Sequence, residues 1–243
     1  FDDTMRMLDA IEPLTRSNGE AAAWSVRVPG ETLQTRHLML CPGGRSYPKT
    51  GTTGDGYHWL RSLELPVVDP APALVPLLSP AAWARELAGI SLAHVVVRLV
   101  TTRGKAVAER RRPLLFTHRG VSGPGPMDLS EAVARSEQVG DRHRYALAID
   151  LCPDETWDDV RSLLTEAARS SPASSVQRHL PVELPQRARA AFLRHLGWHD
   201  RTPRIGDVSR KDRHRLVSAL KGWTLPVIGT RGWDHAEVTA GGL

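Results

Sequence analysis

Strict alternation of apolar and polar residues marks the first β-rich part of the chain. The pentapeptide WSVRV at residues 24–28 has a period of two, which is typical of a strand with one buried face. The β-branched stretch 94–102 predicts another strand, and RGK at 103–105 predicts a hairpin turn into a further strand that runs to Arg112. The apolar run at 37–41 predicts a buried strand. Further strands are expected at 114–117, 145–150, 225–228 and 236–239.

Helical spacing replaces this alternation after residue 152. Apolar residues at i, i+3, i+4 and i+7 predict a helix over 157–169, with Asp154 placed as its N-cap. A second helix is predicted over 185–196, because this stretch begins with a proline and is followed by a glycine. Ser209 is placed to cap a third helix, and Gly222 to end it.

The order of these elements predicts a domain inserted into another domain. Five prolines between residues 66 and 80 exclude a long helix or a central strand there and predict a crossing between domains. Several short strands with turns between them then suggest a small barrel or sandwich. The helical module follows, and the chain returns to β structure at its end.

Composition narrows the class of protein. The chain has 243 residues, of which 41% are hydrophobic and 24% charged, as in an ordinary globular protein. The two cysteines form no CxxC pair, so a reducing cytoplasm is expected. The net charge is +5, and 28 of the 32 basic residues are arginine. Arginines suit nucleic-acid contacts, but here they alternate with acidic residues and form a run only at 110–112. A small basic barrel that binds RNA therefore stays open as an alternative.

The most unusual stretch, at 43–56, holds five glycines between an apolar run and a predicted helix at 55–65, with Asp55 placed as its cap. Each glycine costs about 0.5–1 kcal/mol relative to alanine in ordered structure. Two explanations stay open: the glycines serve tight turns, or they let the backbone approach a ligand closely. The stretch contains neither a P-loop nor a GxGxxG pattern.

No self-contained active site is visible. The sequence GVSGP at 120–124 lacks the last glycine of a nucleophile elbow. His195 and His199 are four residues apart, but Gly197 interrupts their helix, so no metal site is expected.

Three segments, taken together, resemble a known family. They are LMLCPGGRSYPKTGTTGDGY (38–57), LLFTHRGVSGPGPMDLS (114–130) and VIGTRGWDHAEVTAGGL (227–243). Each resembles a signature of the aminoacetone-oxidase-like NAD(P)/FAD-dependent flavoproteins, and their order and spacing also match. The resemblance implies an α+β multidomain fold: part of a Rossmann-like FAD domain, made of a β-meander and a return strand, with an inserted small β-barrel and a small helical bundle.

The same resemblance implies domain boundaries. Residues 1–73 and 236–243 are expected in the FAD-binding domain, 74–151 and 223–235 in the barrel, and 152–222 in the helical bundle. The family's first glycine fingerprint and its last glycine-rich segment have no counterpart here. The chain is therefore expected to be the central portion of an FAD-dependent oxidoreductase, supplying part of the flavin pocket and the insert that covers the substrate, and to be inactive alone.

Site residues carry over from the family by position. Cys41-Pro42 replaces the family's Ala-Thr before the two glycines. Tyr47, Lys49 and His118 are candidates for catalysis only through their place on the matching loops. FAD is the implied cofactor, with NAD(P)H as a second redox partner and a small molecule as substrate; no nucleic-acid or membrane partner is expected. The residues expected at the cofactor are Gly43, Gly44, Ser46, Pro48, Thr50, Gly51, Thr239, Gly241 and Gly242.

Overall fold

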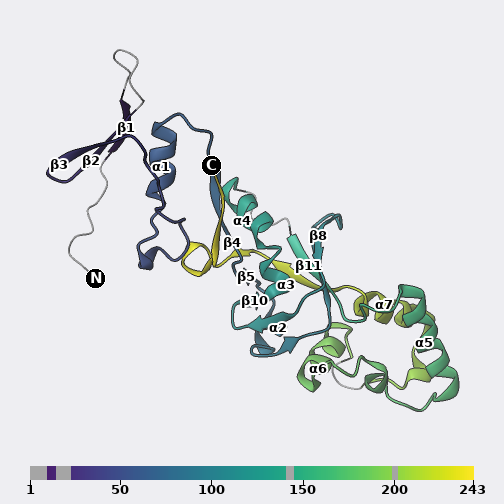
Figure 1. The fold of residues 1–243 in the computed structure, drawn as a ribbon. Helices are drawn as coiled ribbons and strands as arrows, with labels where there is room; N and C mark the ends of the chain where they lie inside the picture. Colours follow the sequence, from purple (N-terminus) through teal and green to yellow (C-terminus); the bar gives the residue numbers. More distant parts are fainter. Residues whose placement is uncertain (1–9, 15–22, 141–144, 199–201) are drawn as a thin grey trace. The chain divides into compact units, whose positions relative to one another are not determined.

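The computed structural model describes residues 10–14, 23–140, 145–198 and 202–243 (Figure 1). The chain divides into two compact units. The first is Phe1–Ala71 together with Val238–Leu243, and the second is Pro72–Glu237. The mixed α+β composition expected from the sequence is confirmed, since strands and helices occur in both units.

The first unit contains an antiparallel three-stranded meander. Gly30, with a φ of 86°, makes the tight turn between its second and third strands. A second, two-stranded sheet pairs β4 with β14, the last strand of the chain. The elements of this unit are β1 (Ala10–Leu14), β2 (Ala23–Val28), β3 (Glu31–Thr35), the 3₁₀ helix η1 (Pro48–Thr50), α1 (Asp55–Ser62), β4 (Val68–Ala73) and β14 (Val238–Gly242).

Two sequence predictions for this unit are wrong. The stretch 37–41 is not a buried strand: it has no regular structure, and Met39 is 87% exposed. An apolar run becomes a strand only where a partner strand and a covering layer exist, and the described residues supply neither at this position. Asp55 does not cap α1, because it is already the first helical residue. The N-cap is Gly54, in the left-handed region, and the Asp55 carboxylate instead accepts a hydrogen bond from Thr53.

Proline placement in β4 agrees with the predicted crossing. Pro70 and Pro72 lie inside this strand. A proline lacks the N–H that a central strand needs, so it is tolerated only where one side of the strand stays unpaired. In the described part of the chain β4 pairs with β14 alone.

The second unit holds two antiparallel sheets. One has the strand order β13-β5-β10-β9-β6 and the other β12-β11-β7-β8. The predicted hairpin is confirmed, with Gly104 at a φ of 79° between β7 and β8. The strands are β5 (Leu77–Leu78), β6 (Ser91–Leu92), β7 (Val96–Thr101), β8 (Ala106–Arg110), β9 (Leu114–Thr117), β10 (Gly120–Ser122), β11 (Tyr145–Asp150), β12 (Trp223–Val227) and β13 (Gly229–Thr230).

Helices complete the second unit, and α5 and α7 pack on each other. The N-cap predicted for α5 is wrong: Thr156, not Asp154, caps it, and Asp159 closes a capping box with Thr156. The cap predicted for α7 is confirmed, because Ser209 accepts a hydrogen bond from the Asp212 N–H at 3.1 Å. The helices are α2 (Ala82–Glu86), α3 (Pro124–Met127), α4 (Ser130–Gln138), α5 (Trp157–Ser170), η2 (Val176–His179), α6 (Gln186–His195), η3 (Ile205–Asp207), α7 (Arg210–Leu220) and η4 (Trp233–His235).

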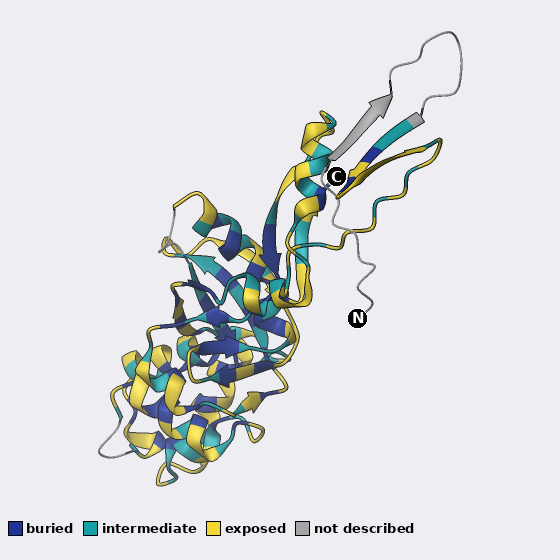
Figure 2. Ribbon diagram, turned by 90° about the vertical axis from the view of Figure 1, so that its left-hand side faces the viewer, coloured by how far each residue is buried: buried dark blue, intermediate teal, exposed yellow. Residues whose placement is uncertain are grey.

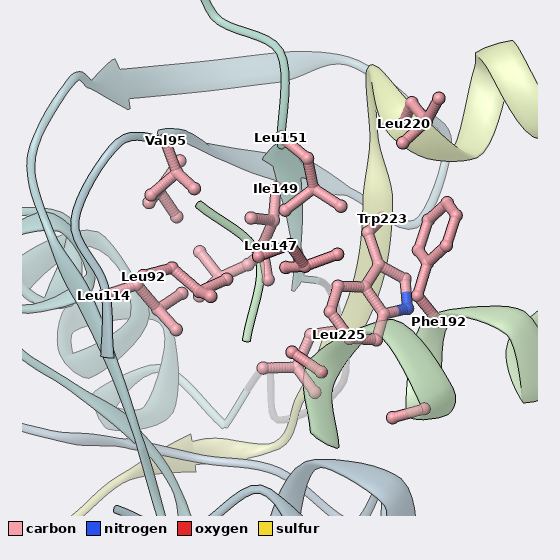
Figure 3. Close-up of a cluster of buried hydrophobic side chains, with 14 of the residues drawn as sticks. Leu92, Val95, Leu114, Leu147, Ile149, Leu151, Phe192, Leu220, Trp223 and Leu225 are labelled. Atoms are coloured by element: carbon pink, nitrogen blue, oxygen red, sulfur yellow. The ribbon is translucent and has the colours of Figure 1, made fainter. Parts of the chain in front are cut away.

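A continuous core joins the sheets and the helices of the second unit (Figures 2 and 3). β12 alternates between buried and exposed positions, so Trp223 and Leu225 point into this core. The Trp223 ring stacks on Trp83 at a centroid distance of 4.4 Å and meets the Phe192 ring edge-on at 5.5 Å. Trp223 therefore connects α2, β12 and α6 in one aromatic cluster.

Candidate functional site

Two segments that are almost two hundred residues apart meet at Thr239 in the first unit. The Thr239 hydroxyl oxygen accepts hydrogen bonds from the N–H groups of Arg45 at 2.8 Å and Ser46 at 3.2 Å. It also lies 3.0 Å from the Ser46 hydroxyl. One side chain of β14 thus fixes the backbone of the glycine-rich loop.

Further hydroxyl groups hold the loop in a compact turn. Thr50 donates its hydroxyl to the carbonyl oxygen of Tyr47 at 2.8 Å, and Thr52 donates to the carbonyl oxygen of Ser46. Tyr47 itself has a φ of 52°, in the left-handed region where a bulky residue is rare. The hydrogen bonds around Tyr47 hold it in this unfavourable conformation.

Close approach of protein atoms explains three glycines. A Cβ at Gly44 would lie 2.5 Å from the Thr239 hydroxyl oxygen. One at Gly56 would lie 2.4 Å from Pro42, and one at Gly241 would lie 2.8 Å from the carbonyl oxygen of Asp69. Any side chain at these positions would separate the loop, α1, β4 and β14.

Gly51 is different. Its φ of 95° favours glycine, but a Cβ there would meet nothing within 4 Å. The backbone at Gly51 is therefore bare and open. Of the two explanations that the sequence left open, the turn accounts for the Gly51 conformation, and room for a ligand remains at this position.

The structure brings together the residues expected at the cofactor. All of them lie on the loop 43–51 or on β14, within the first unit. Tyr47, 45% exposed, and the exposed Lys49 lie on the same loop. His118 is exposed in the turn between β9 and β10 and belongs to the second unit. Whether these residues contact a cofactor stays a prediction.

A buried charge cluster in the second unit was missed by sequence analysis. The Asp150 side chain, 2% exposed, lies 2.8 Å from the Lys221 ammonium and 3.2 Å from the Arg98 guanidinium. Lys221 also donates to the carbonyl oxygens of Cys152 at 2.7 Å and Glu155 at 2.5 Å. This cluster ties the end of α7 to β11 and to the segment before α5. No local pattern signals it, because its charges are 52 or more residues apart.

Each arginine of the run at 110–112 forms an ion pair with a carboxylate. Arg112 lies 2.7 Å and Arg110 3.8 Å from the Asp128 carboxylate. Arg111 lies 2.5 Å from Asp154. The hydrogen bonds from Arg111 and His94 lower the pKa of Asp154. The three arginines share two carboxylates, and their side chains are 46%, 53% and 53% exposed, so an RNA contact at the barrel stays a prediction.

A cavity of about 330 Å³ lies beside the buried charge cluster of Asp150 and Lys221. The residues that line it include Cys152, Leu164 and Leu180. Burial, reinforced by Glu155 and Asp150, raises the pKa of the Cys152 thiol to about 12. Because the thiolate is the reactive form, Cys152 is not a nucleophile at neutral pH.

The described residues contain no group of three or more His, Cys, Asp or Glu side chains arranged to hold a metal ion. None of the helices in this part of the chain combines the length and apolar composition that crossing a bilayer requires.

The second unit combines antiparallel sheets and a helical module around one core. This combination indicates the class of protein to which the chain belongs. Residues 71–238 match the family described as HI0933-like protein barrel and H2TH domain. The match covers more than half of the chain, so the chain belongs to the HI0933-like family.

Curated relatives extend the match beyond the barrel and helices. The chain is 32% identical over 229 residues to a ribosomal RNA dihydrouridine synthase of Escherichia coli, covering 92% of this chain and 52% of the relative. It is 29% identical over 228 residues to the protein of the same name in Haemophilus influenzae, covering 93% and 52%. It is 24% identical over 225 residues to a 3-dehydro-bile acid delta(4,6)-reductase of Clostridium scindens, covering 92% and 53%.

The chain thus spans about half the length of these relatives. Their names differ from that of the expected subfamily. The comparisons support the wider family and not the aminoacetone-oxidase-like group.

Proposed function

We propose that this chain is part of a flavin-dependent reductase that saturates a carbon–carbon double bond conjugated with a carbonyl group. The relatives' names support this reaction class. Dihydrouridine is uridine with its C5–C6 double bond reduced, next to the C4 carbonyl, and a delta-4 bond of a 3-dehydro bile acid is likewise next to a carbonyl. Two different substrates thus share one reaction.

Ribosomal RNA is the substrate that we propose. The relatives named for it are the more similar ones, at 32% and 29% identity against 24% for the bile acid reductase. This proposal replaces the expectation of a small-molecule substrate without a nucleic-acid partner. It also changes the sense of the RNA alternative: RNA would be the substrate of the reductase, and not the ligand of a separate basic barrel.

The observation that carries the location of the site is the junction at Thr239. The loop and β14 are fixed to each other by hydrogen bonds to one hydroxyl, and the Gly51 backbone beside them is open. A flat ring needs such a bare and rigid wall, and these residues fit that requirement. We propose that the first unit is part of a Rossmann-like FAD domain and that the second unit is its insert.

A bound flavin supplies the hydride in this class of reaction. The chain's own residues must hold the ring, and one of them must give a proton to the second carbon of the double bond. Tyr47 and Lys49 are candidates for this acid, because both lie on the loop that Thr239 fixes; His118, on the second unit, is a third candidate. NADH or NADPH is the proposed source of electrons for the flavin.

The test compares Thr239→Val with Thr165→Val in the full-length protein that contains this chain. Thr165 is the control, because among the described residues its exposed hydroxyl makes a hydrogen bond only within its own helix, to the carbonyl oxygen of Arg161 at 2.8 Å, and joins no second segment. We expect the wild type and Thr165→Val to purify with flavin and to convert uridine to dihydrouridine in ribosomal RNA, and Thr239→Val to lose most of its flavin.

Flavin occupancy is measured by visible absorbance, and dihydrouridine by the mass gain of two hydrogens. A wild-type protein that stays colourless in excess FAD would refute the flavin assignment. Full flavin occupancy in Thr239→Val would refute the location of the site.

A further inference from the structure

The basic charge of this protein is concentrated in the second unit. Residues 72–237 contain 25 Lys and Arg against 18 Asp and Glu, a net charge of +7. Residues 1–71 and 238–243 contain 7 against 9, a net charge of −2. A partner with many negative charges would therefore be attracted to the second unit.

Several exposed cations of the second unit, Arg103 and Lys105 among them, make no ion pair among the described residues, and two more are adjacent at the start of one helix. The run at 110–112 is held by Asp128 and Asp154. Arg210 and Lys211, at the start of α7, are exposed and have no ion pair among the described residues. The nearby carboxylate of Asp212 is already engaged by Ser209 at 2.8 Å and Arg215 at 3.0 Å.

Helix formation does not favour the positions of these two cations. The N-terminus of a helix carries a partial positive charge, which disfavours Arg and Lys in the first turn. Arg210 and Lys211 nevertheless occupy the first two positions of α7. Their place adds positive charge to a helix end that is already positive, as an anion-binding surface requires.

Aromatic groups lie on the same surface. His214, one turn after Arg210 and exposed, packs on the Trp157 ring of α5 at a centroid distance of 5.1 Å. The Arg161 guanidinium lies 5.8 Å from the centre of that same ring and pairs with the Asp158 carboxylate at 3.0 Å. An exposed imidazole supported by another ring is a stacking partner for an unpaired base, and Arg210 and Lys211 suit the phosphates.

We propose that the α5–α7 face, made of Trp157, Arg161, Arg210, Lys211 and His214, binds single-stranded RNA. This proposal rests on the proposed function, because ribosomal RNA is the substrate assigned there. It adds the surface through which the RNA is held: phosphates at Arg210 and Lys211, and a base at His214. In Figure 1 this face belongs to the helices α5 and α7 of the second unit.

The test is the binding of a fluorescein-labelled, uridine-containing single-stranded RNA oligonucleotide to the full-length protein, measured by anisotropy at several salt concentrations. The double variant Arg210→Gln, Lys211→Gln removes the two cations at the start of α7. Arg103→Gln, Lys105→Gln is the matched control, because it also removes one arginine and one lysine, from the exposed hairpin tip of the same unit. Circular dichroism and Tm confirm that each variant is folded.

We expect the Arg210/Lys211 variant to bind RNA about tenfold more weakly at low salt, with the slope of log K against log salt reduced by about 1.4, since each lost single-strand phosphate contact contributes roughly 0.7. The control keeps both values near those of the wild type. His214→Ala lowers affinity and leaves the salt slope unchanged, because a stacking contact releases no counterions.

Equal losses in the two double variants, or no loss in either, would overturn the assignment of this face. The result also separates the two proposals. A wild type that reduces free uridine but binds no RNA would refute the surface and preserve the reductase. A wild type that binds RNA through Arg210 and Lys211 but holds no flavin would preserve the surface and refute the reductase.

Discussion

The two compact units are held together internally by different forces. Of the buried hydrophobic side chains in the described residues, only Val26, Val28 and Ala71 belong to the first unit. All the others belong to the second, as the distribution of buried residues in Figure 2 shows. In the first unit, backbone pairing within the meander and between β4 and β14 is supplemented by the Thr239 hydroxyl and by glycines that allow close approach.

The contacts of the second unit therefore mainly determine folding stability, and those at Thr239 in the first unit mainly determine the geometry of the loop. Apolar burial contributes about 25 cal/mol for each Å² removed from water, so the second unit has the larger source of folding free energy. Hydrogen bonds to Thr239 contribute only about 1 kcal/mol each, yet they fix the loop geometry. Substitutions in the second unit are therefore expected to unfold the protein, and substitutions in the first to change the loop locally.

The largest effect is expected at Trp223. It is fully buried and in contact with the rings of Trp83, Phe116 and Phe192. Trp223→Ala removes all of these contacts and leaves a cavity, which costs about 3–5 kcal/mol in the free energy of unfolding. Urea denaturation followed by circular dichroism measures this loss. A change below about 1 kcal/mol would contradict the view that this cluster joins sheet and helices.

The buried charge cluster comes next. Among the described residues, Lys221→Met leaves the buried Asp150 carboxylate with Arg98 as its one charged partner, and we expect a loss of about 3 kcal/mol in the free energy of unfolding. Adding Asp150→Asn to this variant removes the buried charge, so the double variant is expected to be more stable than Lys221→Met alone.

The exposed pair of Arg169 and Glu166 supplies the control for this prediction. Their side chains are 79% and 65% exposed. Arg169→Met is therefore expected to change stability by less than about 1 kcal/mol. If the double variant is less stable than Lys221→Met, the Asp150 carboxylate stabilises the protein through contacts other than its ion pair with Lys221.

Sequence patterns predicted the second unit best where local spacing decides the structure. β9 and β11 have the predicted bounds, and Gly104 and Ser209 occupy the predicted turn and cap. β12 was predicted over 225–228 and lies at Trp223–Val227. These features depend on neighbours in the chain, so a local pattern is sufficient.

Other features depend on contacts between distant residues, and these were missed. The apolar run at 37–41 lacked a partner strand among the described residues. The wrong cap of α5 was instead a local miss, because Thr156 and Asp159 form a capping box within one turn. α4 was not predicted. Its Glu137 carboxylate accepts hydrogen bonds from the N–H and the hydroxyl of Thr230, which is 93 residues away. The candidate site was found only through the family resemblance; its geometry at Thr239 required the structure.

A local effect is expected at Gly44 in the first unit. Gly44→Ala places a methyl group 2.5 Å from the Thr239 hydroxyl oxygen, so the loop and β14 must separate. Gly222→Ala is the control, since its nearest neighbour would be 3.6 Å away. We expect faster hydrogen exchange at 42–56 in Gly44→Ala alone, with the exchange of the second-unit strands unchanged. Equal exchange at 42–56 in both variants would show that Thr239 does not hold the loop.

The smallest effect leaves the fold intact and compares one thiol in each unit. Cys41 is exposed, whereas burial and nearby carboxylates raise the pKa of Cys152 to about 12. A raised pKa keeps the Cys152 thiol almost entirely protonated at pH 8. Iodoacetamide at this pH is expected to modify Cys41 and to spare Cys152, and modification of Cys152 is expected to rise with pH. Peptide mass spectrometry measures both. Equal labelling at pH 8 in the folded protein would mean that the segment after β11 opens readily, and the second unit would then lack the rigidity that its core implies.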